Sequence, residues 1–301
     1  MGPSLTTLET QAPSAERRRR APAPRVHIAW LAVAAVALAL VYLPTVQWLF
    51  ERWTLSVWHN AHGMLIPAAV AYFAYLELTR VRELPASSSA WGFLFVIPAL
   101  GLHVLDTGLH TQLLSAASIV LLLPGLSLLF LGRPRTAAIA FPLAFMALML
   151  PIPLALTEPI HGVLRRIAAE GTAAVIPYLG ITAFVEGTTF RLPKATLHVG
   201  DGCSGFSTLY ASVAVAALTA YTTPVVWRRV LVLLAAAPIA IASNILRVVL
   251  LTAIVNRTGV DVLSTWVHPA SGMMTFALAL PVIFWFGSTK ASGRASNGGR
   301  A

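Results

Sequence analysis

Charged side chains are scarce in this chain of 301 residues, because Lys, Arg, Asp and Glu together make up only 11% of it. Ordinary soluble domains carry about 25%. Hydrophobic residues account for 57% of the chain, and the mean hydropathy is +0.77. This shortage of charge argues against a water-soluble globule and predicts an all-α polytopic membrane protein, with the lipid bilayer as its solvent.

Cysteine is scarcer still, since Cys203 is the only one in the sequence. A single cysteine excludes an intrachain disulfide and any metal site built from several cysteines. The histidines offer no familiar metal-ligand spacing either, so we expect no metal and no cofactor. The residues considered for such a site, all near predicted outer loops, are His59, His62, His103 and His110, with Asp106.

Acidic residues are outnumbered, with 11 against 21 basic ones and a net charge of +10. Much of the positive charge lies near the N-terminus, in Arg17 to Arg20 and Arg25, and the rest is scattered in short loops. This pattern is typical of the lysine and arginine bias of cytoplasmic loops and not of a nucleic-acid-binding surface. We therefore expect no nucleic-acid partner and a multi-pass protein of the cell inner (cytoplasmic) membrane.

Eight apolar runs each approach the length of about 20 residues that a bilayer requires. They cover residues 28–50, 61–79, 91–105, 112–131, 137–157, 203–221, 230–255 and 268–287. If the N-terminal arginines lie inside, every inner loop carries a basic pair, as the positive-inside rule requires. Those pairs are Arg80 and Arg82, Arg133 and Arg135, Arg228 and Arg229, and Lys290 and Arg294.

This topology divides the chain into three parts. We expect a disordered basic cytoplasmic tail over residues 1–25, a single transmembrane domain over 26–288, and a second disordered cytoplasmic tail over 289–301. Residues 158–202 form a small extracytoplasmic helix and β insertion in this prediction. Helical spacing over Ile160–Ile176 indicates a helix at the interface. Alternation from Ile181 to Val199 predicts short strands with a turn near Glu186 and Gly187.

Cys203 lies where the polar insertion gives way to an apolar run. Its neighbours are Gly202, Gly205, Asp201 and Ser204, at the predicted first turn of a helix. A helix N-terminus favours an anion and so favours a nucleophilic thiolate. The alternative is a small residue tolerated in a glycine-rich turn. Since a carboxylate so near a thiolate would oppose its ionisation, we expect Asp201 to cap the helix.

Two further polar residues are predicted at the same depth as Cys203. Arg247 lies within an apolar run, with Asn244 one turn earlier on the same helix face, and His268 opens the last run. A membrane arginine is a functional candidate by default, although Arg247 is also compatible with snorkelling or a helix–helix polar contact. His268 is compatible with a hydrated cap. Together a thiol, an imidazole and a guanidinium suffice for peptide cleavage through a thioester.

Four motifs in this order resemble the exosortase/archaeosortase family of membrane proteins. They are Met149–Pro153, Asp201–Ser207, Asn244–Arg247 and His268–Gly272, within about residues 140–285. The resemblance implies that Cys203, Arg247 and His268 are catalytic. The residues expected to bind substrate or support this set are Asn244, Ser204, Gly202, Gly205 and Asp201.

The resemblance also implies a function. Family members are thought to be cysteine proteases or transpeptidases that cut C-terminal sorting signals of exported proteins, made of a Pro-Glu-Pro-like motif, a membrane helix and a basic tail. We expect cleavage at the outer face, with Arg165, Arg191 or Lys194 attracting the acidic residue of the motif. Two alternatives remain open: a transporter whose polar pathway is lined by Arg247, Asn244 and Asp106, and a non-catalytic scaffold for envelope polysaccharide export.

Overall fold

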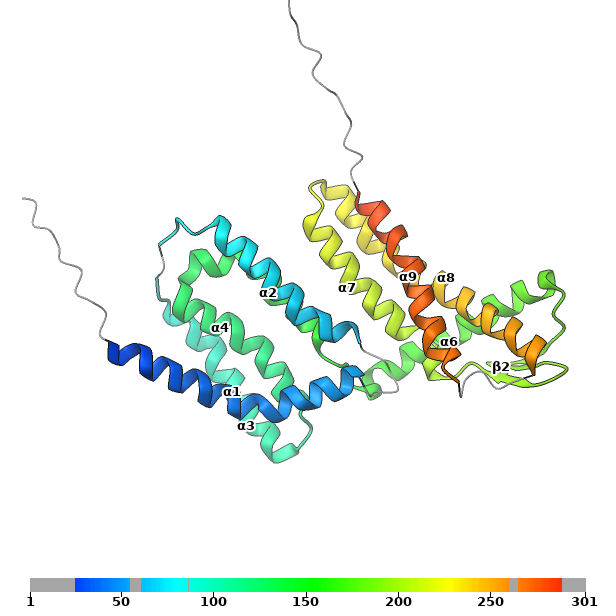
Figure 1. Cartoon of the computed structure of the whole chain (residues 1–301), viewed down its shortest axis with the longest axis horizontal. Coiled ribbons are helices and arrows are strands. Elements are labelled where there is room, and N and C mark those ends of the chain that lie inside the picture. The colour runs from blue at the N-terminus through cyan, green and yellow to red at the C-terminus, as the bar shows by residue number, and fades with distance from the viewer. Residues whose placement is uncertain (1–24, 55–60, 86, 260–264, 289–301) are drawn as a thin grey trace, which may run out of the picture. The chain divides into compact units, whose positions relative to one another are not determined.

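A computed structural model describes residues 25–54, 61–85, 87–259 and 265–288 (Figure 1). The contacts divide the chain into two units, Met1–Leu43 and Pro44–Ala301, and every contact discussed below lies within the second. The long helices are α1 (Arg25–Thr54), α2 (His62–Arg80), α3 (Phe93–Leu109), α4 (Leu113–Ala138), α6 (Leu154–Val175), α7 (Phe206–Thr222), α8 (Val226–Thr258) and α9 (Val267–Gly287).

The remaining elements are short. They are the helix α5 (Ala140–Phe145), the 3-10 turns η1 (Ala90–Gly92), η2 (Met146–Met149), η3 (Ile176–Leu179) and η4 (Asp201–Cys203), and the strands β1 (Phe184–Glu186), β2 (Thr189–Arg191) and β3 (Thr196–His198). The predicted terminal tails, 1–25 and 289–301, fall outside the described residues except for Arg25, which opens α1.

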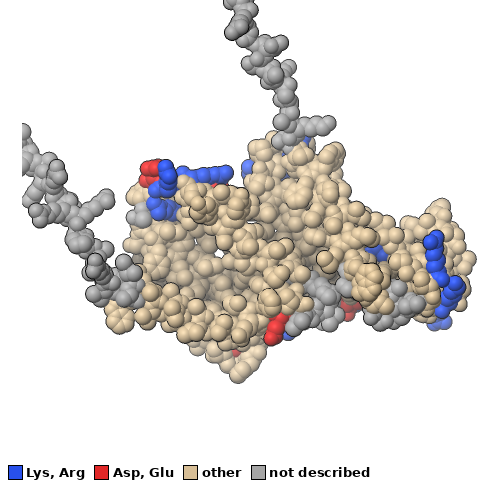
Figure 2. Space-filling model, viewed as in Figure 1, with Lys and Arg blue, Asp and Glu red and all other residues tan. Residues whose placement is uncertain are grey.

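Six stretches among the described residues are long and apolar enough to cross a membrane, in agreement with the predicted polytopic all-α protein. They are Trp30–Thr54, Ala90–Leu109, Leu113–Ala138, Asp201–Thr222, Val226–Thr258 and Ala270–Gly287. In Figure 2 the charged side chains gather at a few places, and broad surfaces between them carry none. The predicted run 61–79 forms α2, which is not among the six because His62, two tyrosines and Glu77 lower its hydropathy.

The predicted span over residues 137–157 is wrong as a single helix. It divides into the last residues of α4, then α5, η2, an extended stretch and the start of α6. The cause is a pair of prolines, Pro151 and Pro153, which lack backbone N–H groups and push the residues before them out of the helical region. Leu150 accordingly has an extended backbone, with ψ at 130°.

α5 and η2 nevertheless run antiparallel beside α7. The Phe141 ring stacks on Tyr221, with centroids 3.9 Å apart, and the hydroxyl of Tyr210 donates to the Leu150 carbonyl at 3.2 Å. The residues from 141 to 150 therefore cover the same depth as α7 from Tyr221 back to Tyr210. A second donor reaches this stretch, because the Trp53 indole N–H bonds the Met149 carbonyl at 3.0 Å.

α7, α8 and α9 pack against one another, and α6 packs against α8. Small residues allow close approach, as is usual between membrane helices. Gly171 of α6 faces Ile245 of α8 so closely that a Cβ on the glycine would lie 2.7 Å from Ile245 Cδ1. Gly162, on the same helix, has only one atom within 4 Å of such a Cβ, the Arg165 Nη2 at 3.9 Å.

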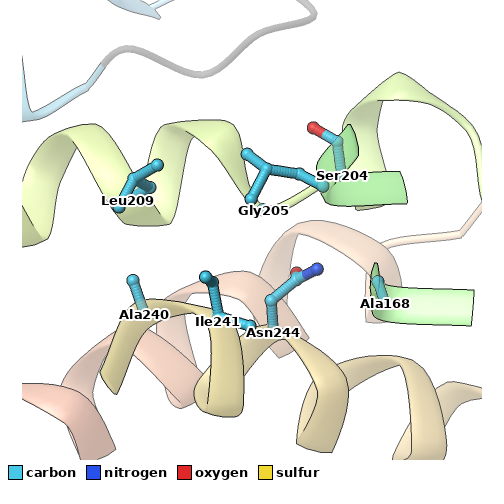
Figure 3. Close-up of a pocket in the computed structure, with 8 residues that line it drawn as sticks. Ala168, Ser204, Gly205, Leu209, Ala240, Ile241 and Asn244 are labelled. Carbon is cyan, nitrogen blue, oxygen red and sulfur yellow. The ribbon is translucent and has the colours of Figure 1, made fainter. Parts of the chain in front are cut away.

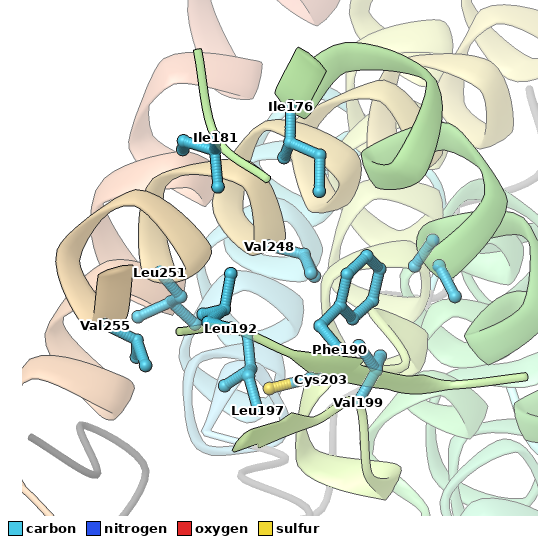
Figure 4. Close-up of a cluster of buried hydrophobic side chains, with 12 residues drawn as sticks. Ile176, Ile181, Phe190, Leu192, Leu197, Val199, Cys203, Val248, Leu251 and Val255 are labelled. Carbon is cyan, nitrogen blue, oxygen red and sulfur yellow. The ribbon is translucent and has the colours of Figure 1, made fainter. Parts of the chain in front are cut away.

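The predicted short strands are present. β1, β2 and β3 form an antiparallel sheet in sequence order, and Gly187 has a left-handed φ of 60° in the turn between the first two. Apolar side chains from the sheet segment pack on α8 (Figure 4). The buried members of this cluster around the sheet and α8 include Phe190, Leu192, Leu197, Val199, Val248, Leu251 and Val255. The sheet thereby fixes the chain as it enters η4.

The two glycines of α6 make a matched pair for testing the α6–α8 contact. Gly162→Ala should stabilise the protein by about 1 kcal/mol, because alanine favours the helix and meets open space. Gly171→Ala should instead destabilise it by about 1–3 kcal/mol, since its methyl overlaps Ile245. Thermal unfolding of both variants in detergent tests this, and an equal rise in melting temperature for the two would contradict the packing.

Candidate active site

A sharp turn separates Cys203, the last residue of η4, from α7. Gly205 makes this turn, with a left-handed φ of 83°, and directly precedes the first residue of α7. A Cβ at Gly205 would lie 2.5 Å from Asn244 Cγ. Glycine is therefore required here twice, by the backbone angle and by the close approach of α8.

Asn244 holds the carbonyl of the cysteine itself. Its Nδ2 donates to Cys203 O at 2.9 Å, and the side chain is only 3% exposed. Its Oδ1 has no hydrogen-bond partner among the described residues. Asn244 also lines a small, water-sized pocket of about 10 Å³ beside Ser204 and Gly205, whose other walls are aliphatic (Figure 3).

Arg247, one turn further along α8, joins the turn to α9. Its Nη1 donates to Gly202 O at 3.2 Å and its Nε donates to Ser271 Oγ at 3.0 Å. Gly272 lies against the guanidinium, since a Cβ there would be 3.3 Å from Arg247 Cζ. The side chain is only 4% exposed, so it does not snorkel to the surface. Arg247 therefore makes the expected polar contact between α8 and α9, and the same guanidinium also bonds the turn of Cys203.

The Cys203 side chain is more enclosed than its glycine-rich neighbourhood suggests. It is 4% exposed, and its sulfur belongs to the cluster of buried apolar side chains around the sheet and α8 (Figure 4). The Arg247 guanidinium lies close enough to interact electrostatically with the thiol. A hydrophobic pocket with a cation beside it therefore surrounds the sulfur.

His268 stands in the first turn of α9, and its side chain lies outside the described part of the structure. The backbone of that turn is nonetheless brought to the site, because Ser271 and Gly272 contact Arg247 from the next positions of α9. The role of His268 stays a prediction.

Asp201 does not cap α7, contrary to the sequence prediction. The helix begins at Phe206, further along than expected, and the residue before it is Gly205, which has no side chain to cap with. Asp201 instead forms an ion pair with Arg165 of α6, and Arg165 also donates to Glu158 at 2.8 Å. The carboxylate is thus held by a cation on a neighbouring helix.

Sequence reasoning missed His161. This residue of α6 is 2% exposed, its Nδ1 lies 2.8 Å from Ser204 Oγ, and its ring packs on Phe206 with centroids 4.6 Å apart. Burial lowers its pKa; Arg165 acts in the same direction and Glu158 opposes it. The helical spacing of the sequence could have identified it, because His161 lies on the same stripe of α6 as the buried residues Thr157, Leu164, Ala168 and Thr172.

The other polar candidates belong elsewhere. Asp106 accepts hydrogen bonds from Ser115 N at 3.2 Å and from Thr111 Oγ1, and Ser115 Oγ lies 2.9 Å from His103 Nδ1, so this cluster ties α3 to the start of α4. The hydrogen bonds of Arg247 to Gly202 and Ser271, and of Asn244 to Cys203, go to other elements, which weakens the transport pathway. Within the described part of the chain, no group of three metal-ligating side chains comes together, and His59 lies outside it.

The basic residues expected to attract an acidic motif are already engaged. Arg165 pairs with Asp201 and Glu158, and Arg191 donates to Glu186 at 2.9 Å. Lys194 donates to the Arg257 carbonyl at 3.0 Å, at the end of α8.

The family model described as Transmembrane exosortase (Exosortase_EpsH) matches residues 53–285. The chain belongs to the transmembrane exosortase family. The match begins at the end of α1 and ends in α9, so it includes α2, α3 and α4, where the sequence motifs offered only hydropathy. Comparisons of this exosortase with curated proteins and with solved structures give no significant match.

Gly205 and Gly200 allow a test of the turn that carries Cys203. Gly205→Ala should destabilise the exosortase by roughly 1–2 kcal/mol from the left-handed backbone alone, with the overlap on Asn244 in addition. Gly200→Ala should be tolerated, because Gly200 has a φ of −82° and the nearest atom to an added Cβ is 3.7 Å away. Thermal unfolding of both variants decides, and equal melting temperatures would refute the requirement for glycine at position 205.

Proposed function

We propose that this exosortase is a membrane cysteine protease or transpeptidase that cuts the C-terminal sorting signals of exported proteins. The observation that carries the proposal is the double hydrogen bonding of Arg247. One guanidinium bonds the turn before Cys203 and the first turns of α9, where His268 stands. The three residues that the family resemblance identifies as catalytic therefore come from elements that contact one another.

In the proposed reaction the Cys203 thiolate attacks the carbonyl carbon of the scissile peptide bond. Arg247 stabilises the thiolate or the oxyanion, and the C–N bond then breaks to leave a thioester on Cys203. His268 accepts the thiol proton and returns it to the leaving amine. Water or an acceptor amine then attacks the thioester and frees the thiol. Because Cys203 is buried, the bound substrate has to part the apolar side chains around the sulfur.

We propose that the polypeptide crosses the cell inner membrane eight times, with both termini in the cytoplasm. The six candidate spans are then joined by α2 and by the broken segment of α5 and η2, which covers the depth of α7 between Tyr221 and Tyr210. The basic loops support a common inner side, since Arg135 donates to the carbonyls of Arg82 and Leu84. The sheet and the Cys203 turn then face outward.

This arrangement suits the proposed substrate physically. A helix lying beside the spans would leave its basic tail at the cytoplasmic side and present the motif that precedes it at the outer face, beside η4. The charge of the tail matches the positive-inside rule that orients the exosortase itself.

Co-expression with a reporter ending in Pro-Glu-Pro, an apolar helix and an arginine cluster tests the proposal. Cys203→Ser should abolish cleavage, by at least about 10³-fold, while inserting normally, because a serine hydroxyl is a far weaker nucleophile than a thiolate. Arg247→Lys should reduce cleavage by about 10²-fold, since an ammonium cannot reproduce the fixed fork that bonds Gly202 and Ser271. Cleavage is followed as a mass shift of the reporter.

Arg166→Lys serves as the control, because Arg166 is an exposed arginine on α6. It should cleave at the rate of the unchanged chain. Undiminished cleavage by the Cys203→Ser variant would reject the thioester mechanism. No cleavage by the unchanged chain would favour a non-catalytic scaffold or a transporter.

A further inference from the structure

Side chains from two helices hold the turn of Cys203 at four consecutive residues. α8 bonds two backbone carbonyls, with Arg247 on Gly202 and Asn244 on Cys203. α6 holds the two flanking side chains, with Arg165 on Asp201 and His161 on Ser204. The contacts from α6 come from positions four apart, which lie on one face of a helix. The turn is therefore held by both helices, and the contacts from α6 have no role in the reaction proposed above.

Ser204 connects the contacts from α6 to the start of α7. Its Oγ accepts a hydrogen bond from the Phe206 backbone N–H at 3.3 Å, which is a local bond that shapes the start of the helix. The residue is only 2% exposed. Since a serine hydroxyl has one hydrogen to donate, it can donate to His161 Nδ1 and accept from Phe206 N at the same time.

We propose that His161 is a positioning residue for Cys203, which holds the Ser204 hydroxyl and through it fixes the backbone between the thiol and the first turn of α7. The inference rests on the proposed function, because it concerns the placement of the same thiol. His161 acts through Ser204 and is not assigned any contact with substrate.

The environment of His161 suits a neutral, accepting ring. Burial lowers its pKa, and the neighbouring Arg165 disfavours a second cation beside it, although Glu158 acts in the opposite direction. The neutral imidazole offers one unprotonated nitrogen, and the Ser204 hydroxyl lies in hydrogen-bond reach of Nδ1. The Phe206 ring covers the imidazole and limits its rotation.

The lone cysteine makes the inference measurable without any substrate. Alkylation of the full chain in detergent by a small thiol reagent reports on Cys203 alone, because the sequence has no other thiol. Loss of the His161–Ser204 bond should loosen the turn and expose a thiol that is now 4% exposed. His161→Ala and Ser204→Ala should each raise the alkylation rate by about fivefold or more, and each should lower reporter cleavage by about tenfold.

Two isosteric variants separate positioning from general packing. An asparagine at position 161 can place an amide oxygen near the position of Nδ1, whereas a glutamine places its amide further out, near Nε2. His161→Asn should therefore keep alkylation and cleavage within about threefold of the unchanged chain, while His161→Gln should behave like His161→Ala. The double variant of His161→Ala with Ser204→Ala should match either single variant, because both remove the same bond.

Thr172→Val is the matched control on the same buried stripe of α6. Thr172 is fully buried, and its hydroxyl has no partner among the described residues, so the isosteric valine should leave both readouts unchanged. Unaltered alkylation in His161→Ala, rescue by glutamine as good as by asparagine, or additive effects in the double variant would each overturn the proposal. If instead Cys203→Ser still cleaves the reporter, the proposed function fails while the alkylation result still decides the role of His161.

Discussion

The four side-chain contacts on the turn from Asp201 to Ser204 are the constraint on which the rest of the structure depends. The backbone of the turn contributes the short hydrogen bonds of η4, from Cys203 N to Gly200 O and from Ser204 N to Asp201 O, and the α-helix that follows begins only at Phe206. Both helices that supply the contacts are in turn packed on the sheet segment and on each other. The small β-sheet, the close contact at Gly171 and the glycine at position 205 all serve to bring α6 and α8 to the same short stretch of chain.

Hydropathy and helical spacing predicted much of this exosortase correctly. Apolar runs located the six candidate spans, alternation located the three strands, and the spacing of Asn244 and Arg247 placed them on one face of a helix. Hydropathy failed over residues 137–157 because it measures transfer to lipid and is blind to the backbone donors that two nearby prolines remove.

The tertiary partners could not be predicted. Asp201 was expected to cap a helix, but Arg165 is 36 positions earlier in the sequence and no local pattern links the two residues. His161 resembled one more polar residue of an amphipathic helix, and only its position on the buried stripe distinguished it. The burial of the thiol was hidden for the same reason, since its apolar neighbours come from the strands and from α8.

The proline break after η2 gives two helices that are far apart in the sequence a common attachment point. Carbonyl groups left without helical partners are tolerated in hydrocarbon only where other donors reach them. Here the donors are two aromatic side chains, Trp53 from the end of α1 and Tyr210 from α7. The irregular stretch is thus hydrogen-bonded from two sides, and it connects the end of α1 to the helix that follows Cys203.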